Sequence, residues 1–190
     1  MRKIVLASSS PRRREILEMS GIPFTVEPSD YEEDMSLSLP PQELAVLLAS
    51  GKAQSVALRH PNALIIGADT FVVLGVEVMG KPYTADRAKE MLRSLSDTWH
   101  QIITGYCIID TRTGTNISGA EISRVKFKPL SDAEINSYIA TGEPLDRAGA
   151  YAIQGGAAKF VERIEGNYLS ILGLPLIKIL KELEAFGICP

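Results

Sequence analysis

The sequence has few cysteines, no long hydrophobic run and no strong excess of one charge. Cys107 and Cys189 stand far apart, and neither belongs to a CxxC pair or to a Cys/His spacing typical of zinc ligands. We therefore expect reduced thiols in a cytoplasmic protein. No apolar stretch approaches the roughly 18 residues of a membrane helix, and the first residues lack the apolar segment of a secretory signal. The net charge of −3 argues against binding to nucleic-acid polymers or anionic membranes, which usually requires a basic surface.

Several catalytic motifs are absent as well. The chain has no GxSxG motif, and no GxGxxG motif follows a predicted strand. The stretch from Gly75 to Lys81 imitates the spacing of a phosphate-binding P-loop, but Pro82 stands where a metal-binding hydroxyl is needed. We therefore reject a P-loop, find no support for covalent serine or cysteine catalysis, and do not expect a dinucleotide oxidoreductase. Lys81 keeps two alternative roles, an anion contact and an ordinary surface lysine.

The length and the order of elements predict a single α/β domain over residues 1–190. A chain of 190 residues with 45% hydrophobic residues can bury a sizeable core. We predict strands in the apolar run after Ile4 and over 24–27, 63–66, 101–110, 115–127 and 159–164, with a hairpin over 71–79. We predict helices that begin near Pro11, Pro41, Ala85, Ser131 and Pro175. This order predicts a mixed, twisted sheet with helices on its faces.

The segment after the first strand carries the signature of an anion site. It reads Ser8-Ser9-Ser10-Pro11-Arg12-Arg13-Arg14. Ser10 suits a helix N-cap and Pro11 suits the first helical position, so free N–H groups, hydroxyls and guanidinium groups meet at a helix start. Such groups together predict a phosphate site. Three adjacent arginines cannot share one helix face, so at most two should reach a ligand. The alternative is a capped helix whose arginines face water.

Two acidic positions could supply a metal site. Asp69 and Thr70 follow the apolar strand at 63–66, where open α/β sheets place their ligands, and Glu33 belongs to the acidic loop 30–34. Mg²⁺ usually takes one or two protein carboxylates and completes its shell with water and substrate phosphate. The alternative for Asp69 is an aspartate that caps a turn, and the alternative for Glu33 is a solvated acidic loop.

The segment 142–156 is rich in small residues and turn formers, and it contains Gln154 before two glycines. Small side chains let a backbone approach a ligand closely, and an amide group can read the edge of a nucleobase. The alternative is a structural loop with a solvated Gln154.

Together these segments resemble the Maf family of nucleoside triphosphate pyrophosphatases. The matching strings lie in order along nearly the whole chain: Ala7-Ser-Ser-Ser-Pro-Arg-Arg13, Gly67-Ala-Asp-Thr70, Gly80-Lys-Pro82, Gly142-Glu-Pro144, Asp146-Arg-Ala-Gly-Ala-Tyr-Ala-Ile-Gln-Gly155 and Gly173-Leu-Pro175. The resemblance implies an α/β protein with two lobes around a central cleft, usually a homodimer. It also implies divalent-metal-dependent hydrolysis of a nucleotide between the α and β phosphates, which gives a monophosphate and pyrophosphate.

The string Gly-Ala-Tyr-Ala-Ile-Gln-Gly resembles that of the family branch that acts on dTTP and UTP. This resemblance implies a role in cleaning the nucleotide pool. By that resemblance Asp69 is the proton acceptor, and Arg12, Thr70 and Gln154 are associated with substrate choice. We predict that Asp69 and Glu33 hold Mg²⁺ or Mn²⁺. The predicted phosphate contacts are Ser8, Arg12, Arg13, Lys52 and Lys81. One departure is Arg147, which stands where the family usually has lysine and changes the donor geometry.

Two other functions would use the same arginine junction. One is a non-catalytic, nucleotide-binding regulator of cell division, and the other is a phosphoanhydride hydrolase that releases orthophosphate. Asp69 and the acidic loop favour an enzyme over a regulator, because simple anion binding gains nothing from carboxylates beside a triphosphate.

Overall fold

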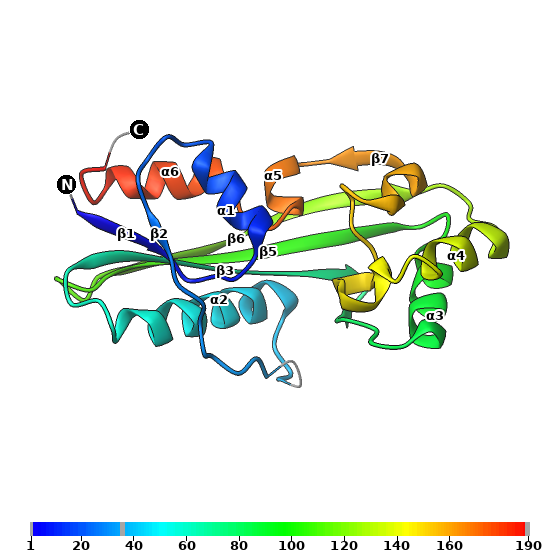
Figure 1. Cartoon of the computed structure of the whole chain (residues 1–190), viewed down its shortest axis with the longest axis horizontal. Coiled ribbons are helices and arrows are strands. Elements are labelled where there is room, and N and C mark those ends of the chain that lie inside the picture. Colours follow the sequence, from blue (N-terminus) through cyan, green and yellow to red (C-terminus); the bar gives the residue numbers. More distant parts are fainter. Residues whose placement is uncertain (1, 35–36, 189–190) are drawn as a thin grey trace. The chain divides into compact units, whose positions relative to one another are not determined.

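A computed structural model describes residues 2–34 and 37–188 and has the element order of an α/β protein (Figure 1). The strands are β1 Lys3–Leu6, β2 Thr25–Val26, β3 Ala63–Leu74, β4 Glu77–Met79, β5 Trp99–Asp110, β6 Asn116–Phe127 and β7 Val161–Glu165. The α-helices are α1 Pro11–Glu18, α2 Pro41–Ala57, α3 Ala85–Leu95, α4 Asp132–Ile139, α5 Tyr168–Ile171 and α6 Leu176–Glu184. Three short 3₁₀ turns precede β7: η1 Glu143–Asp146, η2 Ala148–Ala150 and η3 Gly156–Phe160.

The described strands form one mixed sheet. Its order is β2-β1-β3-β5-β6-β7, and β4 pairs with β3 outside this path. The strand β1 pairs in parallel with β2 and β3, whereas β3–β4 and β6–β7 are antiparallel pairs. The predicted α/β fold with a mixed sheet and flanking helices is therefore confirmed.

The chain forms two compact units, each assembled from separate segments. Unit 1 contains the residues up to Asp69, the segment Thr104–Glu121 and the residues from Leu172 onward. Unit 2 contains Thr70–Ile103 and Ile122–Ile171. The number of units agrees with the two lobes that the family resemblance implies. A central cleft stays a prediction, and so does the treatment of 1–190 as a single domain.

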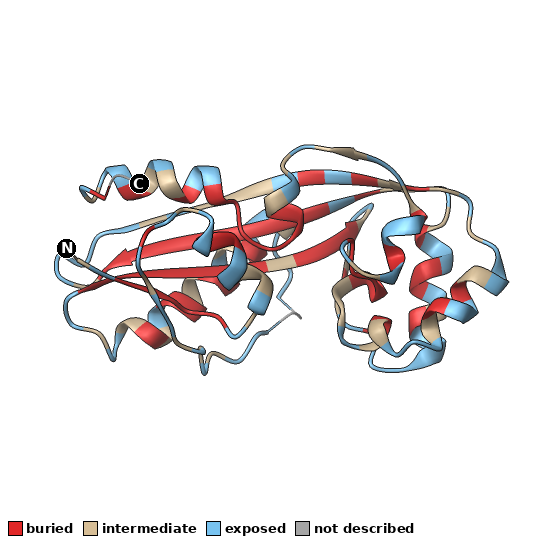
Figure 2. Ribbon diagram, turned by 45° about the horizontal axis from the view of Figure 1, so that its top comes forward, coloured by how far each residue is buried: buried red, intermediate tan, exposed pale blue. Residues whose placement is uncertain are grey.

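In unit 1, α2 covers one face of the sheet, and α1 and α6 cover the other (Figure 1). Glycines in the strands let α2 approach closely, because a Cβ at Gly67 of β3 or at Gly105 of β5 would overlap the backbone of α2. Most residues of the central strands β3 and β5 are buried (Figure 2). Leu44, Leu48 and Val56 of α2 are buried, whereas Leu47 is 39% exposed.

Unit 2 contains α3, α4 and the three 3₁₀ turns. The Thr84 hydroxyl accepts a hydrogen bond from the Arg87 N–H at the start of α3. Ser131 and Glu134 form a capping box at the start of α4. Buried aromatic rings join β6, α4 and the segment with the 3₁₀ turns through edge-to-face contacts: Phe127, Tyr138, Tyr151 and Phe160.

Three predicted strand boundaries are wrong. The strand over 63–66 and the first arm of the hairpin over 71–79 are one continuous strand, because almost every residue of Ala63–Leu74 is buried in the sheet. The strand over 24–27 shrinks to Thr25–Val26, because its partner β1 ends at Leu6. The strand over 159–164 begins at Val161, because the 3₁₀ turn Gly156–Phe160 occupies the preceding residues.

Cys107 of β5 is a free, buried thiol, and burial raises its pKa. The expectation for Cys189 falls outside the described residues. Among residues 2–34 and 37–188, every helix is too short or too polar to serve as a membrane span.

Candidate functional site

The junction between β1 and α1 brings hydroxyl groups to a helix start, as predicted. The Ala7 N–H donates to the Ile66 carbonyl oxygen at 2.8 Å, which fixes the chain after β1 against β3. The Ser8 hydroxyl, which is buried, accepts from the Ser10 N–H at 3.2 Å. The Ser10 hydroxyl accepts from the Arg13 N–H at 3.5 Å and is the N-cap of α1. Ser8 therefore lies at the positive end of the helix dipole.

Among the three adjacent arginines, Arg13 is the one whose side chain contacts Ser8, Gly173 and Asp69 of unit 1. Its Nε donates to the Gly173 carbonyl oxygen at 2.9 Å, and its Nη1 donates to the Ser8 hydroxyl at 3.3 Å. Its Nη2 lies 4.0 Å from Asp69 Oδ1. Burial lowers the pKa of Arg13, while the charges of Asp69 and Glu33 raise it. Neighbouring Arg12 is half-buried, and Arg14 pairs with Glu18 on the exposed side of α1.

Lys52 joins the two carboxylates that the sequence suggests as metal ligands. It lies on α2, and its Nζ is 2.5 Å from Asp69 Oδ1 and 2.6 Å from Glu33 Oε1. Asp69 is only 6% exposed. The sequence predicts Asp69 after the end of a strand, but it lies inside the long strand β3. It comes after the last pair of residues in the parallel ladder between β1 and β3, Leu6 with Ile66. Asp69 thus still occupies the carboxyl side of the parallel pairing, where α/β sheets place ligands.

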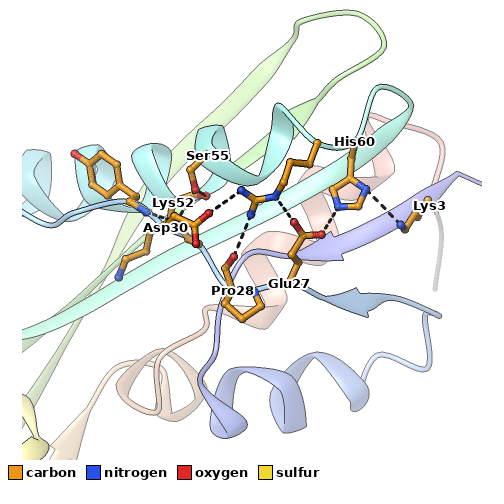
Figure 3. A network of polar contacts seen from close by, with 10 residues as sticks. Lys3, Glu27, Pro28, Asp30, Lys52, Ser55 and His60 are labelled. Atoms are coloured by element: carbon orange, nitrogen blue, oxygen red, sulfur yellow. Dashed lines mark hydrogen bonds and ion pairs between the residues drawn. The ribbon is translucent and has the colours of Figure 1, made fainter.

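A network of polar contacts anchors the loop that carries Glu33 (Figure 3). Arg59 contacts the carboxylates of Glu27 and Asp30, and its Nη2 donates to the Pro28 carbonyl oxygen at 3.2 Å. The second oxygen of Glu27 lies 2.5 Å from His60 Nε2. These contacts lower the pKa of Glu27, with the hydrogen bond to His60 as the largest cause and that to Arg59 next. The start of the loop is therefore held at the end of α2.

The same loop packs on α2 beside Lys52. The hydroxyls of Ser29 and Ser55 are 2.7 Å apart. The Tyr31 ring lies over Gly51, where any Cβ would overlap it. Sequence reasoning missed Gly51 and Arg59 as site-supporting residues. The available signal was a glycine in a helix interior, which usually costs stability and so points to a packing reason.

The other predicted site residues belong to unit 2. Thr70 directly follows Asp69 on β3 and is half-buried. Lys81 pairs with Asp146, with 2.6 Å between Nζ and Oδ1. Gln154 is exposed, in a turn closed by the Gly155 N–H, which donates to the Ala152 carbonyl oxygen at 2.9 Å.

Unit 1 thus brings five of the predicted residues into one cluster: Ser8, Arg13, Glu33, Lys52 and Asp69. The formal charges of its two cations and two carboxylates cancel. Within 2–34 and 37–188 no set of three or more His, Cys, Asp and Glu residues could hold a metal ion. An ion here would rely on Asp69, Glu33, water and substrate. Both carboxylates already converge on one cation, the Lys52 ammonium, and oxygen donors suit Mg²⁺ or Mn²⁺, so the residues fit such an ion.

The fold and this cluster define an α/β protein with two cations and two carboxylates gathered beside the N-terminus of its first helix. The chain belongs to the Maf family: residues 3–186 match the family described as Maf-like protein.

Similar curated proteins cover nearly the whole chain. A protein of Geobacter sulfurreducens is 46% identical over 97% of both chains. One of Geobacter metallireducens is 48% identical over 97% of this chain and 96% of its own, and one of Pyrococcus furiosus is 48% identical over 97% and 95%. All three are named dTTP/UTP pyrophosphatase. The solved structure of the Staphylococcus aureus Ham1 protein matches with a TM-score of 0.49 and 14% identity, over 66% of this chain and 72% of that one.

Proposed function

We propose that this chain is a nucleoside triphosphate pyrophosphatase that hydrolyses dTTP and UTP between the α and β phosphates. The observation that carries the proposal is the contact of one ammonium group, Lys52 Nζ, with the two carboxylates of Asp69 and Glu33. Arg13, in the first turn of α1, lies beside Asp69. The names of the relatives support this substrate class. The family also implies a homodimer and a cytoplasmic role in cleaning the nucleotide pool, which stay part of the proposal.

Phosphate binding falls to the cations and the helix start. The Arg13 guanidinium and the Ser8 hydroxyl offer directed N–H and O–H donors, and Lys52 adds a point charge. These groups neutralise charge on the triphosphate and on the departing pyrophosphate. Arg12, on the same turn of α1, and Lys81, in unit 2, complete the proposed phosphate set.

Asp69 is the proposed general base. It accepts a proton from a water molecule whose oxygen attacks the α-phosphorus in line with the α–β bridging oxygen. The bond from the α-phosphorus to that bridging oxygen breaks, and the oxygen leaves with pyrophosphate. Lys52 donates to Asp69 Oδ1 at 2.5 Å, which orients the carboxylate and leaves Oδ2 to take the proton.

The metal-binding residues in this proposal are Asp69 and Glu33. The cluster alone has no excess positive charge for a triphosphate, so a divalent ion is the missing counter-charge. When bound, Mg²⁺ or Mn²⁺ supplies charge neutralisation on phosphate oxygens and a more acidic bound water.

Selection of a pyrimidine base is assigned to Thr70, Gln154 and Arg12. The Gln154 amide has both a donor and an acceptor, which match the carbonyl and N–H edge of thymine or uracil. A purine is rejected because the polar groups of Gln154 and Thr70, once covered by the bound base, are left unpaired, a penalty that can reach a factor of about 10⁴.

Product analysis tests the reaction directly. The purified protein is incubated separately with dTTP, UTP, CTP and GTP, with Mg²⁺ and with a chelator. We expect pyrophosphate and monophosphate from dTTP and UTP, and none with the chelator. Orthophosphate and a diphosphate would mean that another bond is cleaved, and binding without turnover would favour a regulator. Full activity with the chelator would remove the metal from the proposal.

A further inference from the structure

The turn that carries Gln154 is held at both ends by two side chains that the proposed chemistry does not use. On the N-terminal side, the hydroxyl of the buried Tyr138 accepts from the Ala152 N–H at 3.2 Å. On the C-terminal side, Glu143 Oε2 accepts from the Gly156 N–H at 2.8 Å. Because both anchors are made to backbone, they fix the course of the chain around Gln154 and leave its side chain exposed.

The glycine after Gln154 has a structural reason of its own. Gly155 has φ −109°, which other residues readily adopt. A Cβ there, however, would overlap the Glu143 carboxylate. The carboxylate therefore lies against the Gly155 backbone and occupies the place of a side chain. There is also little room for a side chain at Gly156, because a Cβ placed there would lie 3.2 Å from Glu143 Oε2 and 3.0 Å from the Tyr138 ring.

Glu143 also influences the pKa of Tyr138. The pKa of Tyr138 is raised to about 12, with burial as the largest cause and the charge and hydrogen bond of Glu143 acting in the same direction. Tyr138 itself is fixed by α4 and by an edge contact with Phe160, at a centroid distance of 5.3 Å. The anchors thus connect the turn to a helix and to the aromatic core of unit 2.

We propose that Glu143 and Tyr138 are positioning residues that hold the Gln154 turn in the conformation that reads the base. This assigns a role to the Gly142-Glu143-Pro144 string, and it rests on the proposed function, in which Gln154 selects a pyrimidine. Neither side chain takes part in bond breaking, so their loss should act on substrate choice more than on the chemical step.

The test compares Glu143→Ala, Glu143→Gln and Tyr138→Phe with Gln154→Ala in the full-length protein. Glu162→Ala, an exposed glutamate on β7, is the matched control. The measured quantity is kcat/KM for dTTP relative to GTP. We expect Glu143→Ala and Tyr138→Phe to lower this ratio by about tenfold, in the direction of Gln154→Ala, because small misplacements of a contact group have effects of this size or larger. Glu143→Gln keeps an acceptor oxygen and should retain most of the ratio.

Amide exchange gives a readout that is independent of activity. The Gly156 N–H should exchange about tenfold faster in Glu143→Ala, as expected for the loss of one hydrogen bond, and at the native rate in Glu162→Ala. Gly155→Ala should also disturb the turn, but adding it to Glu143→Ala should have little further effect, because the overlapping carboxylate is gone.

The outcomes separate this inference from the proposed function. If Gln154→Ala shifts the ratio and the Glu143 and Tyr138 variants do not, the positioning role is wrong and base reading stands. If Gln154→Ala leaves the ratio unchanged, base reading by Gln154 is wrong, and the positioning role falls with it. Unchanged exchange of the Gly156 amide in Glu143→Ala would overturn the anchor itself.

Discussion

At the scale of single residues, Lys52 is the centre of the candidate site. One ammonium group touches a buried carboxylate of β3 and a half-exposed carboxylate of a loop. An uncompensated charge in such a place is costly, so each of the three groups depends on the others. A bound triphosphate competes with the two carboxylates for Lys52, and a divalent ion offers those carboxylates a new partner. Substrate and metal are therefore expected to bind cooperatively.

The Asp69→Asn variant tests the assignment of the general base. Asparagine keeps the shape and one acceptor oxygen, so the fold should persist, but it cannot take a proton. We expect turnover of dTTP to fall by about 10² or more. Steady-state kinetics beside a thermal melt measure this, with Asp86→Asn on the exposed start of α3 as the control. Near-native turnover in Asp69→Asn would assign the base elsewhere.

At the scale of elements, the contact of Tyr31 with Gly51 sets the position of the acidic loop. An alanine in the interior of α2 should favour the helix by up to about 1 kcal/mol. The same methyl group overlaps the ring of Tyr31. The ring is the mobile end of a side chain, so the loop should yield before the helix does, and Glu33 should move with it.

Gly51→Ala should therefore leave thermal stability nearly unchanged and lower kcat/KM for dTTP by about tenfold. Gln54→Ala, a substitution at an exposed position of the same helix, shows what a change in helix propensity does without the clash. A Gly51→Ala enzyme with native kcat/KM would show that Tyr31 does not position Glu33.

Local signals in the sequence were sufficient for several elements. Ser10 and Ser131 cap their helices as predicted, because capping depends on residues within one turn. The extent of β3 could not be read in the same way, since the Gly67-Ala-Asp-Thr segment imitates a turn while its neighbours in the sheet keep it extended.

The candidate site was predicted only in part. Asp69, Glu33, Lys52, Arg13 and Ser8 were named from motifs and from the resemblance, and the structure brings them together. Their support was not predicted, because the contact of Tyr31 with Gly51 and the anchoring of Gly156 by Glu143 join residues distant in sequence. A single sequence contains no signal for such pairs beyond an unusual glycine.

At the scale of the whole molecule, acid stability depends on carboxyl groups whose pKa is lowered by hydrogen bonds from basic side chains. They include Glu27, Asp110, Asp132, Glu134 and Asp146. Arg2 is the largest cause that lowers the pKa of Asp110 from 3.8 to about 2, and Lys128 is the largest cause that lowers that of Glu134 from 4.5 to about 2.

A carboxyl group with a lowered pKa in the folded state stabilises the fold above its unfolded pKa. The stabilisation disappears as the pH falls toward the folded value. We expect the melting temperature to drop steeply between about pH 4 and pH 2, and this drop to be shallower in Asp110→Asn, which cannot titrate. Melts at a series of pH values measure this. Superimposable profiles for both proteins would show that Asp110 does not contribute.

The strands β3, β5 and β6 each pass from one unit into the other, so neither unit is a continuous piece of chain. This has a consequence for synthesis on the ribosome. Unit 1 lacks α6 until the segment from Leu172 onward has emerged, although its first 69 residues are made at the beginning. The strands β1, β2 and β3 can pair with one another early, but β3 must wait for its other neighbour, β5, and contacts of high sequence separation form slowly. The apolar sheet face that α6 covers in unit 1 therefore stays exposed until the last part of the chain has been made.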